Sequence, residues 1–230
     1  MKIGIIYAMQ KEIQTYYDFN KFQKIKYDIY GIDIYISHSK KIILIKSGIG
    51  KVSSSIACTI LITLYKVDIV INIGSGGSLK PYINIHDIIL IKKTSYHDVN
   101  LTNFHYSIGQ IPNFPQTFQT NNLLRKKFKN ILYENKIKFW EGQVVSGDIF
   151  IQTKKDVEII LKNFPNAISV DMESASISQV CFQYNKPVII IKIISDYITK
   201  NTTTIFQKNI KKIFYKSSHI IKKYIQTIMM

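Results

Sequence analysis

The stretch VIIIKIISD, residues 188–196, is a run of Ile and Val, interrupted by one lysine, that ends in a serine and an acid. Two other short apolar runs, residues 3–7 and 167–170, are also followed within a few positions by an acid. The acids after the three runs are Asp196, Glu12 and Glu173. Such runs are typical of strands buried in an α/β sheet. Because these sheets bind ligands beyond the carboxyl ends of their strands, we expect the three acids to converge on one crevice.

Acids are scarce in this chain, which makes their recurrence at strand ends informative. The sequence holds 15 Asp and Glu residues against 31 Lys and Arg, and its formal net charge is +16. A lysine-rich nucleic-acid-binding module is one interpretation of that charge, since phosphate backbones attract basic residues. Arg125 is the only arginine, however, whereas specific phosphate recognition favours the bidentate guanidinium. Lys, Ile and Asn are over-used together along the whole chain, so we predict no nucleic-acid partner.

Length and hydrophobicity predict a single domain spanning residues 1–230. Single α/β domains commonly run to roughly 200–250 residues. No apolar stretch approaches the ~18 residues of a membrane span, and the N-terminal run is too short for a signal peptide. We therefore expect a cytoplasmic protein without a membrane partner. Cys58 and Cys181 each lie in an apolar helical pattern, outside any metal or redox motif. Buried free thiols are the favoured interpretation and a disulfide is the alternative.

The order of expected elements predicts an α/β fold, a three-layer α/β/α sandwich with a mixed central sheet. Strands and helices alternate along the chain, with a glycine-rich turn expected at residues 74–78 after a buried strand. The helix that follows residue 51 is expected to carry Val52, Ile56, Ile60 and Leu64 on one face. Strands are expected at 2–7, 32–36, 42–45, 68–73, 88–91, up to 145, 167–170 and from 187, and helices near 8–18, 52–64, 121–135, 154–163, 174–184 and 206–228.

Each candidate residue has a functional and a structural interpretation. Ser75 lies in the glycine-rich turn, where backbone N–H groups can approach a ligand, or where the turn is merely tight. Asp196 follows so apolar a run that we expect a raised pKa and a proton held for delivery, unless it only caps a turn. Glu173 and Asp171 could instead stabilise the next helix by their charge, and Glu12 could be a first-turn acid of the first helix.

Taken together, these residues resemble one known family, the bacterial 5′-methylthioadenosine/S-adenosylhomocysteine nucleosidases. The resemblance covers essentially the whole chain in the right order and implies a nucleoside phosphorylase-like fold. Seven segments carry it: Gly4-Ile5-Ile6 with Ala8-Met9 and Glu12; residues 46–52 (KSGIGKV); residues 72–77 (NIGSGG); Tyr96-His97-Asp98; Val145-Ser146-Gly147-Asp148 with Phe150-Ile151; Met172-Glu173; and Ile194-Ser195-Asp196.

The resemblance implies a role for each matched acid. Glu12 would be the base that polarises the attacking water, and Asp196 would give its proton to adenine N7 with Ser195 orienting it. Glu173 would hold the ribose hydroxyls, and Met172 would pack against the sugar. Cleaving an N-glycosidic bond develops positive charge on the ribosyl ring and negative charge on adenine, so carboxylates near the sugar and a proton at N7 both lower the barrier.

Further residues are matched to the substrate. Adenine would stack on Phe150, with backbone groups of Ile151 reading its edge, and Ser75 matches a position near the nucleophilic water. Apolar contacts around the ribose and alkylthio group would come from Met9, Ile49 and Phe206. The loop containing Phe104 and Pro112 resembles one that reaches the neighbouring subunit's pocket, which implies a homodimer. The implied partners are a small nucleoside and water, with no cofactor and no metal, in methionine salvage.

The sequence also departs from the family pattern. Lys192 stands where Arg is usual before the Ser-Asp pair, Asp171 replaces a more common Glu, and Ser174 an Ala. Tyr7 replaces a small residue and Ser78 a glycine-rich ending, while Gln10 and Lys11 replace further acids. These departures keep every catalytic carboxylate but bear on rate and pocket shape.

Purine nucleoside phosphorylases share the implied fold and are the enzyme alternative. Their phosphate sites depend on arginines, and a chain whose sole arginine is Arg125 is poorly equipped to bind phosphate as the nucleophile. We therefore expect hydrolysis, with adenine and 5-methylthioribose or S-ribosylhomocysteine as products.

Overall fold

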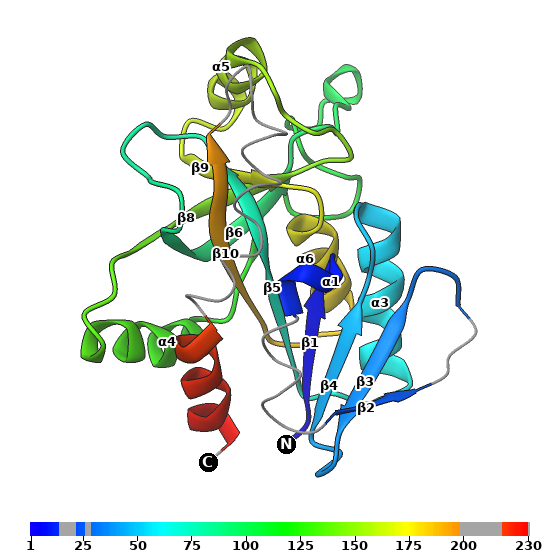
Figure 1. Ribbon diagram of the computed structural model, residues 1–230. Coiled ribbons are helices and arrows are strands. Elements are labelled where there is room, and N and C mark those ends of the chain that lie inside the picture. The colour runs from blue at the N-terminus through cyan, green and yellow to red at the C-terminus, as the bar shows by residue number, and fades with distance from the viewer. Residues whose placement is uncertain (14–21, 26–28, 198–217, 230) are drawn as a thin grey trace.

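The computed structural model describes residues 1–13, 22–25, 29–197 and 218–229 (Figure 1). Its strands are β1 (Ile3–Tyr7), β2 (Phe22–Ile25), β3 (Asp33–Ser37), β4 (Ile42–Lys46), β5 (Ile69–Ser78), β6 (Ile88–Tyr96), β7 (Phe118–Gln119), β8 (Phe139–Ser146), β9 (Ala167–Asp171) and β10 (Val188–Tyr197). Its helices are α1 (Gln10–Ile13), α3 (Lys51–Thr63), the 3-10 helix η2 (Thr102–Phe104), α4 (Asn122–Glu134), α5 (Lys154–Asn163), α6 (Ser174–Gln183) and a helix over 218–229.

The strands form one mixed sheet, as predicted. Their order is β10-β6-β8-β9-β5-β1-β4-β3-β2, with β7 paired to β6. β1 is parallel to both β4 and β5, whereas β3 is antiparallel to β4 and β10 is antiparallel to β6. β10 also pairs with β5 in parallel, so the five strands β10, β6, β8, β9 and β5 close into a ring. The sheet is therefore strongly curled, as the closed ring of strand pairings requires and as Figure 1 shows.

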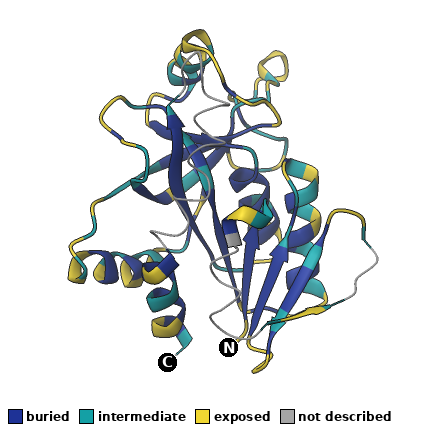
Figure 2. Cartoon of the chain, in the orientation of Figure 1, coloured by how far each residue is buried: buried dark blue, intermediate teal, exposed yellow. Residues whose placement is uncertain are grey.

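Side-chain alternation along the strands makes the three layers. In β10, Ile189, Ile191 and Ile193 contribute to a core shared with α4 and helix 218–229, whereas Val188, Ile190 and Ile194 contribute to a core shared with α3 and α6. The central strands are therefore buried on both faces, which is why they read as continuous apolar runs. Figure 2 shows the central strands buried and the outer helix surfaces exposed.

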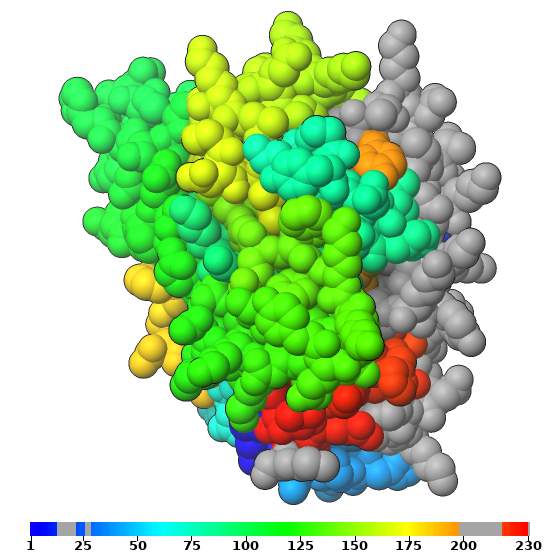
Figure 3. All heavy atoms as spheres, turned by 90° about the vertical axis from the view of Figure 1, so that its left-hand side faces the viewer, coloured from blue at the N-terminus to red at the C-terminus, as the bar shows by residue number. Residues whose placement is uncertain are grey.

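The helix over 218–229 packs against α4, as Figure 3 shows on that side of the molecule. The rings of Tyr224 and Phe128 lie edge to face with centroids 4.9 Å apart. The Tyr224 hydroxyl donates to the Leu124 carbonyl at 3.2 Å. The expected apolar stripe is confirmed for Ile221, Tyr224 and Ile228, which are buried. Its earlier members, Phe206, Ile210 and Ile213, lie outside the described residues.

One prediction about local structure was wrong, and another was incomplete. The glycine-rich segment 74–78 is not a turn but the end of strand β5, because it pairs with both β10 and β9. On α3, the four apolar residues expected on one face differ in burial: Val52, Ile56 and Leu64 are exposed, at 71%, 43% and 55%, and Ile60 is buried. The buried residues of α3 are Ile60, Leu61 and Ile62 together with the small Ser54, Ala57 and Cys58, which allow α3 to pack closely on α6.

The two cysteines lie on this packed pair of helices. The Cys58 and Cys181 sulfurs are buried 3.6 Å apart, and both residues are free thiols. Ser54 Oγ lies 2.7 Å from Ser176 Oγ one turn nearer the helix starts. No helix among the described residues is long and apolar enough to cross a membrane.

Candidate active site

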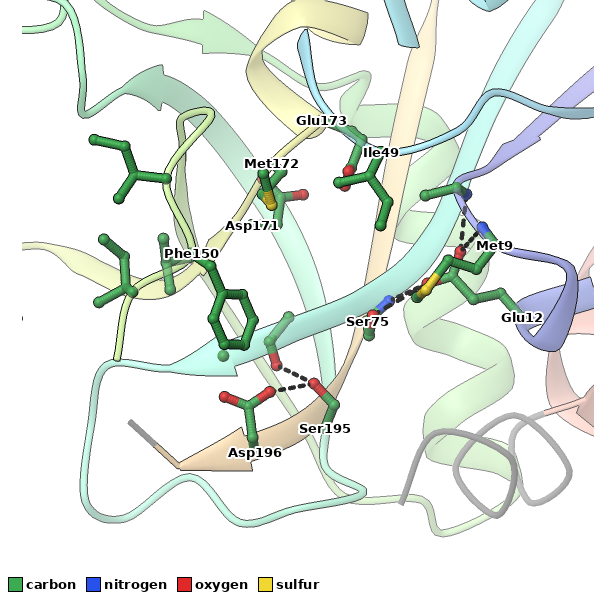
Figure 4. A pocket seen from close by; sticks show the side chains of 16 residues that line it. Met9, Glu12, Ile49, Ser75, Phe150, Asp171, Met172, Glu173, Ser195 and Asp196 are labelled. Carbon is green, nitrogen blue, oxygen red and sulfur yellow. Dashed lines mark hydrogen bonds between the residues drawn. The ribbon is translucent and has the colours of Figure 1, made fainter. Parts of the chain in front are cut away.

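A cavity of about 280 Å³ opens at the carboxyl ends of β1, β5, β9 and β10 (Figure 4). Four acids line it, and the rest of its wall is mostly apolar or small. The lining residues are Ala8, Met9, Glu12, Ile49, Ser75, Gly76, Gly77, Ile149, Phe150, Ile151, Val170, Asp171, Met172, Glu173, Ser195 and Asp196. The convergence of strand ends expected from the sequence is therefore present.

Glu12 is held by donors on both carboxylate oxygens. Oε2 accepts from the backbone N–H groups of Ala8 and Met9 at 2.8 and 3.0 Å. Oε1 accepts from the backbone N–H and the hydroxyl of Ser75, both at 3.1 Å. The side chain is nearly fully buried and lies on the short helix α1, directly after β1. These contacts fix a carboxylate at the floor of the cavity, and Ser75 contributes from the β5 segment that replaced the expected turn.

Asp196 lies at an irregularity in β10. Ile194 pairs with Gly76 and Asp196 with Gly77, which leaves Ser195 as an extra residue in the strand. Bulges of this kind re-aim side chains and are frequent beside active sites. The Ser195 hydroxyl lies 2.5 Å from Asp196 Oδ1 and 3.3 Å from the Gly76 carbonyl. Burial raises the pKa of Asp196, with the Ser195 hydroxyl opposing the shift, so the carboxyl is suited to hold a proton.

Glu173 immediately precedes α6, but its side chain does not cap the helix. Its Oε1 accepts from the Gly50 backbone N–H at 3.1 Å, at the start of α3. The neighbouring Asp171 caps α6 instead, accepting from the Ser174 backbone N–H. The structural interpretation, stabilisation of the next helix, therefore applies to Asp171. Glu173 is left to face the cavity, as Figure 4 shows.

Lys192 is a buried cation behind these acids. Its side chain is 1% exposed, with Nζ 2.7 Å from Asp171 Oδ2 and 3.9 Å from Glu173 Oε2. It points to the same face of β10 as Ile190 and Ile194, toward the start of α6, which explains the lysine within the apolar run. Asp171 also accepts from the Ser146 and Ser174 hydroxyls. Two of the departures, Ser174 and Lys192, therefore both contact the third, Asp171.

The charges of this group shift one another's pKa. Burial raises the pKa of Glu173 to about 7, with Lys192 opposing the shift and Asp171 and Glu12 adding to it. Burial acts to lower the pKa of Lys192, but Asp171 and Glu173 outweigh it and the pKa is raised. Lys192 therefore stays positively charged, whereas the carboxyl group of Glu173 changes its protonation state near neutral pH.

Ten of the thirteen predicted site residues line this cavity: Glu12, Asp196, Ser75, Phe150, Ile151, Met172, Glu173, Ser195, Met9 and Ile49. Figure 4 shows the Phe150 ring on the side of the cavity that holds Asp196. Phe104 is 71% exposed, and neither it nor Pro112 is among the lining residues of this single chain. Phe206 lies outside the described residues.

Sequence reasoning gave no site role to several residues that the structure places here. Asp171 was weighed only with Glu173, and Ala8, Ile149 and Val170 were not singled out for the pocket. Lys192 was noted only as a departure, although a lysine inside an apolar strand requires a buried partner and could have pointed to Asp171. Among the described residues, no cluster of three or more His, Cys, Asp or Glu side chains could hold a metal ion.

Comparison with known proteins agrees with this geometry. Residues 2–226 match the family model described as the phosphorylase superfamily. A 5′-methylthioadenosine/S-adenosylhomocysteine nucleosidase of Buchnera aphidicola subsp. Schizaphis graminum is 49% identical over 230 residues, covering 99% of this chain and 97% of the relative.

Two solved structures are also close. The first is a nucleosidase of the same name from Neisseria meningitidis, in complex with methylthio-immucillin-A. It superposes with a TM-score of 0.93 at 29% identity, covering 98% of this chain and 99% of its own. The second, from Colwellia psychrerythraea in complex with adenine, has a TM-score of 0.90 at 31% identity, with 97% and 94% covered.

The buried position of Lys192 predicts a large cost for its removal. Lys192→Met leaves Asp171 without its cation, so the free energy of unfolding at pH 7 should fall by about 3–5 kcal/mol, whereas Lys192→Arg should retain most of it. Lys129→Met is the matched control, because it breaks a surface pair to Glu141 of the same 2.7 Å length and should cost about 0–1 kcal/mol. Equal losses in chemical denaturation would contradict the role given to burial.

The raised pKa of Glu173 predicts a pH-dependent penalty. Between its ordinary pKa of 4.5 and about 7, the unfolded chain has released this proton while the folded chain keeps it, so stability declines as pH rises through that window. Glu173→Gln should therefore gain stability over the wild type on going from pH 5 to pH 8, by about 3 kcal/mol at most. Denaturation curves at both pH values test this, with the exposed Glu158→Gln as control. A pH-independent difference for Glu173→Gln would refute it.

Proposed function

The chain belongs to the 5′-methylthioadenosine/S-adenosylhomocysteine nucleosidases of the phosphorylase superfamily, and from this premise we propose that Glu12, Asp196 and Glu173 divide one hydrolytic reaction among them. The enzyme hydrolyses the N-glycosidic bond of these two nucleosides, releasing adenine with 5-methylthioribose or S-ribosylhomocysteine. One observation carries the proposal: acids with different surroundings face a single cavity of nucleoside size.

Glu12 is assigned the activation of water. Both of its oxygens are anchored by N–H and O–H donors of Ala8, Met9 and Ser75, so the carboxylate is presented in one orientation. A water bound against it and Ser75 loses a proton to Glu12 as its oxygen bonds to the anomeric carbon. Orientation of this kind is worth more than basicity alone, because the reacting atoms are held near attack distance.

Asp196 is assigned the protonation of the leaving group. When the bond from the anomeric carbon to adenine N9 breaks, its electron pair passes into the purine ring, and the proton of Asp196 goes to N7. A carboxyl group can do this only if it still holds its proton near neutral pH, and the raised pKa that burial gives Asp196 supports this assignment. The Phe150 ring on the same side of the cavity offers a stacking surface for adenine.

Glu173 is assigned the ribose hydroxyls. Glu173 Oε1 accepts a hydrogen bond from the Gly50 backbone N–H, which leaves Oε2 to accept from the ribose hydroxyls. Lys192 Nζ lies 3.9 Å from Oε2. The ionised form also opposes the positive charge that develops on the ribosyl ring. Met9 and Ile49 provide the apolar surface on which the thioether would lie.

Removing either reacting acid should reduce turnover severely. Asp196→Asn and Glu12→Gln should each lower the rate of adenine release from 5′-methylthioadenosine by about 10²–10⁴, the usual contribution of a general acid or base, while the fold is retained. Release is measured in phosphate-free buffer and again after phosphate is added, with Glu158→Gln as the control. Near wild-type turnover of a folded Asp196→Asn would refute the assignment, and a requirement for phosphate would indicate phosphorolysis.

Cytoplasmic location stays a prediction from the sequence. We also infer that two copies of the chain associate. Ile49, Val52 and Ile56 form an exposed apolar strip at the start of α3, at 54%, 71% and 43%. Ile49 lines the cavity as well, so the strip continues into its mouth. Phe104 and Pro112, which do not reach this chain's cavity, are then assigned to the cavity of the second copy.

The association has a direct test. Val52→Asp places a charge in the strip and should convert a dimer to a monomer in sedimentation velocity, with a raised KM because the second copy's loop no longer closes the cavity. Leu123→Asp on α4, also highly exposed at 72%, is the control and should change neither. A wild-type protein that sediments as a monomer would contradict the inference.

A further inference from the structure

Three charged residues come from segments that carried the family resemblance and have no role so far: Lys51, Asp98 and Asp148. The structure brings them together beside the cavity. Lys51 Nζ lies 2.5 Å from Asp98 Oδ2 and 3.9 Å from Asp148 Oδ2. The backbone N–H of Lys51 donates to Asp148 Oδ1 at 2.8 Å, and the backbone N–H of Asp148 donates to Asp98 Oδ2 at 3.0 Å. We call these three residues the Lys51 cluster.

The Lys51 cluster joins two walls of the cavity that are far apart in the sequence. Lys51 is the first residue of α3, and the preceding Gly50 donates its backbone N–H to Glu173 on the ribose side. Asp148 is the second residue of the loop after β8, and this loop carries Phe150 and Ile151 on the adenine side. The described structure therefore has a continuous path of polar contacts from Glu173, through Gly50 and Lys51, to the base of this loop.

The packing around the Lys51 cluster leaves little freedom. Gly50 has φ +98°, and an added Cβ there would lie 2.9 Å from Asp148 Oδ1. A Cβ on Gly147 would lie 2.6 Å from His97 Nε2 and 2.9 Å from Asp98 Cγ. Both positions thus need glycine for the loop and the helix start to approach the acids this closely.

Charge and burial make Asp98 the centre of the Lys51 cluster. Its side chain is 11% exposed, against 46% for Asp148 and 26% for Lys51. Burial acts to raise the pKa of Asp98, but the bond from Lys51 and the Asp148 N–H outweigh it, and the pKa is lowered. An ionised Asp98 with two donors on one oxygen is a stronger link than an exposed pair.

We propose that the Lys51 cluster positions the Phe150–Ile151 loop relative to Glu173, and so sets the distance between the adenine and ribose subsites. None of the three residues lines the cavity, so their proposed role is that of positioning residues. The inference rests on the proposed assignment of adenine to Phe150 and Ile151. N7 must meet Asp196 while the ribose meets Glu173, and a misplacement of about 1 Å can cost roughly 10²-fold in rate.

The test compares three variants with a matched control. Asp98→Asn, Asp148→Asn and Lys51→Met each break the Lys51 cluster and should lower kcat/KM for 5′-methylthioadenosine by roughly 10–100-fold. The dissociation constant for free adenine should rise by roughly tenfold in the same three variants. The conservative variant Lys51→Arg should retain most of the kcat/KM and of the adenine affinity of the wild type. Glu141→Gln removes the partner of Lys129, a side-chain pair remote from the cavity, and should leave kcat/KM and adenine binding unchanged.

The readouts separate positioning from folding. If the variants melt at lower temperature but kcat/KM and the adenine dissociation constant of the folded enzyme stay within twofold of wild type, the Lys51 cluster is only structural and the proposal is overturned. Should Asp98→Asn fail to fold, Asp148→Asn decides the matter, because its side chain is the most exposed of the three.

Phe150→Ala is measured alongside to separate the two proposals. If adenine affinity is unchanged in Phe150→Ala, the assignment of the adenine subsite falls and the inference falls with it. If Phe150→Ala weakens adenine binding while the three variants of the Lys51 cluster do not, the positioning role alone is refuted. Weaker adenine binding in both sets, with rescue by Lys51→Arg, is the expected result.

Discussion

Carboxylates buried at the ends of apolar strands must be met by a cation or by hydrogen-bond donors, and the architecture around the cavity follows from this constraint. An isolated buried charge costs several kcal/mol even after the protein relaxes. Lys192 provides the cation for Asp171 and Glu173. Its ammonium group on β10 lies 2.7 Å from Asp171 Oδ2 and 3.9 Å from Glu173 Oε2. Glu12 instead accepts from four neutral donors, three of them backbone N–H groups. Chemically similar groups therefore have different surroundings, as the proposed division of roles requires.

The glycines of β5 make this crowding possible. A Cβ on Gly74 would lie 3.1 Å from Lys192 Nζ and 3.4 Å from Glu12 Oε1, so the lysine and the acid approach the same point on the strand. A Cβ on Gly76 would lie 2.7 Å from Ser169 Oγ. The glycine-rich segment is thus a strand whose missing side chains leave room for neighbouring ones. Glycine in a strand often marks such a close approach.

The sequence located most of the residues that line the cavity, but it missed parts of the local structure. Apolar periodicity located β1, β9 and β10. β1 and β10 are both parallel to β5 and end at the same edge, whereas β9 reaches the cavity because its last residues pair antiparallel with the end of β5. Apolar periodicity could not distinguish a glycine-rich turn from a glycine-rich strand, since only the pairing with β9 and β10 decides that. Nor could it predict the ring closed by β10 and β5, which depends on contacts distant in sequence. On α3, hydrophobicity marked Ile60 but not the small buried residues Ser54, Ala57 and Cys58.

The charge of the cavity opposes that of the whole chain, and this bears on which nucleophile it can use. The formal net charge is +16, yet none of the described lining residues is Lys or Arg, and four are acids. Lys192, just behind the lining, is committed to Asp171, and Arg125 bonds Lys92, Thr120 and Asn122 on α4 and its surroundings. A phosphate dianion would enter such a cavity against repulsion and find no guanidinium to bind it. Water carries no such penalty, and the same negative field stabilises the cationic ribosyl group as the bond to adenine breaks.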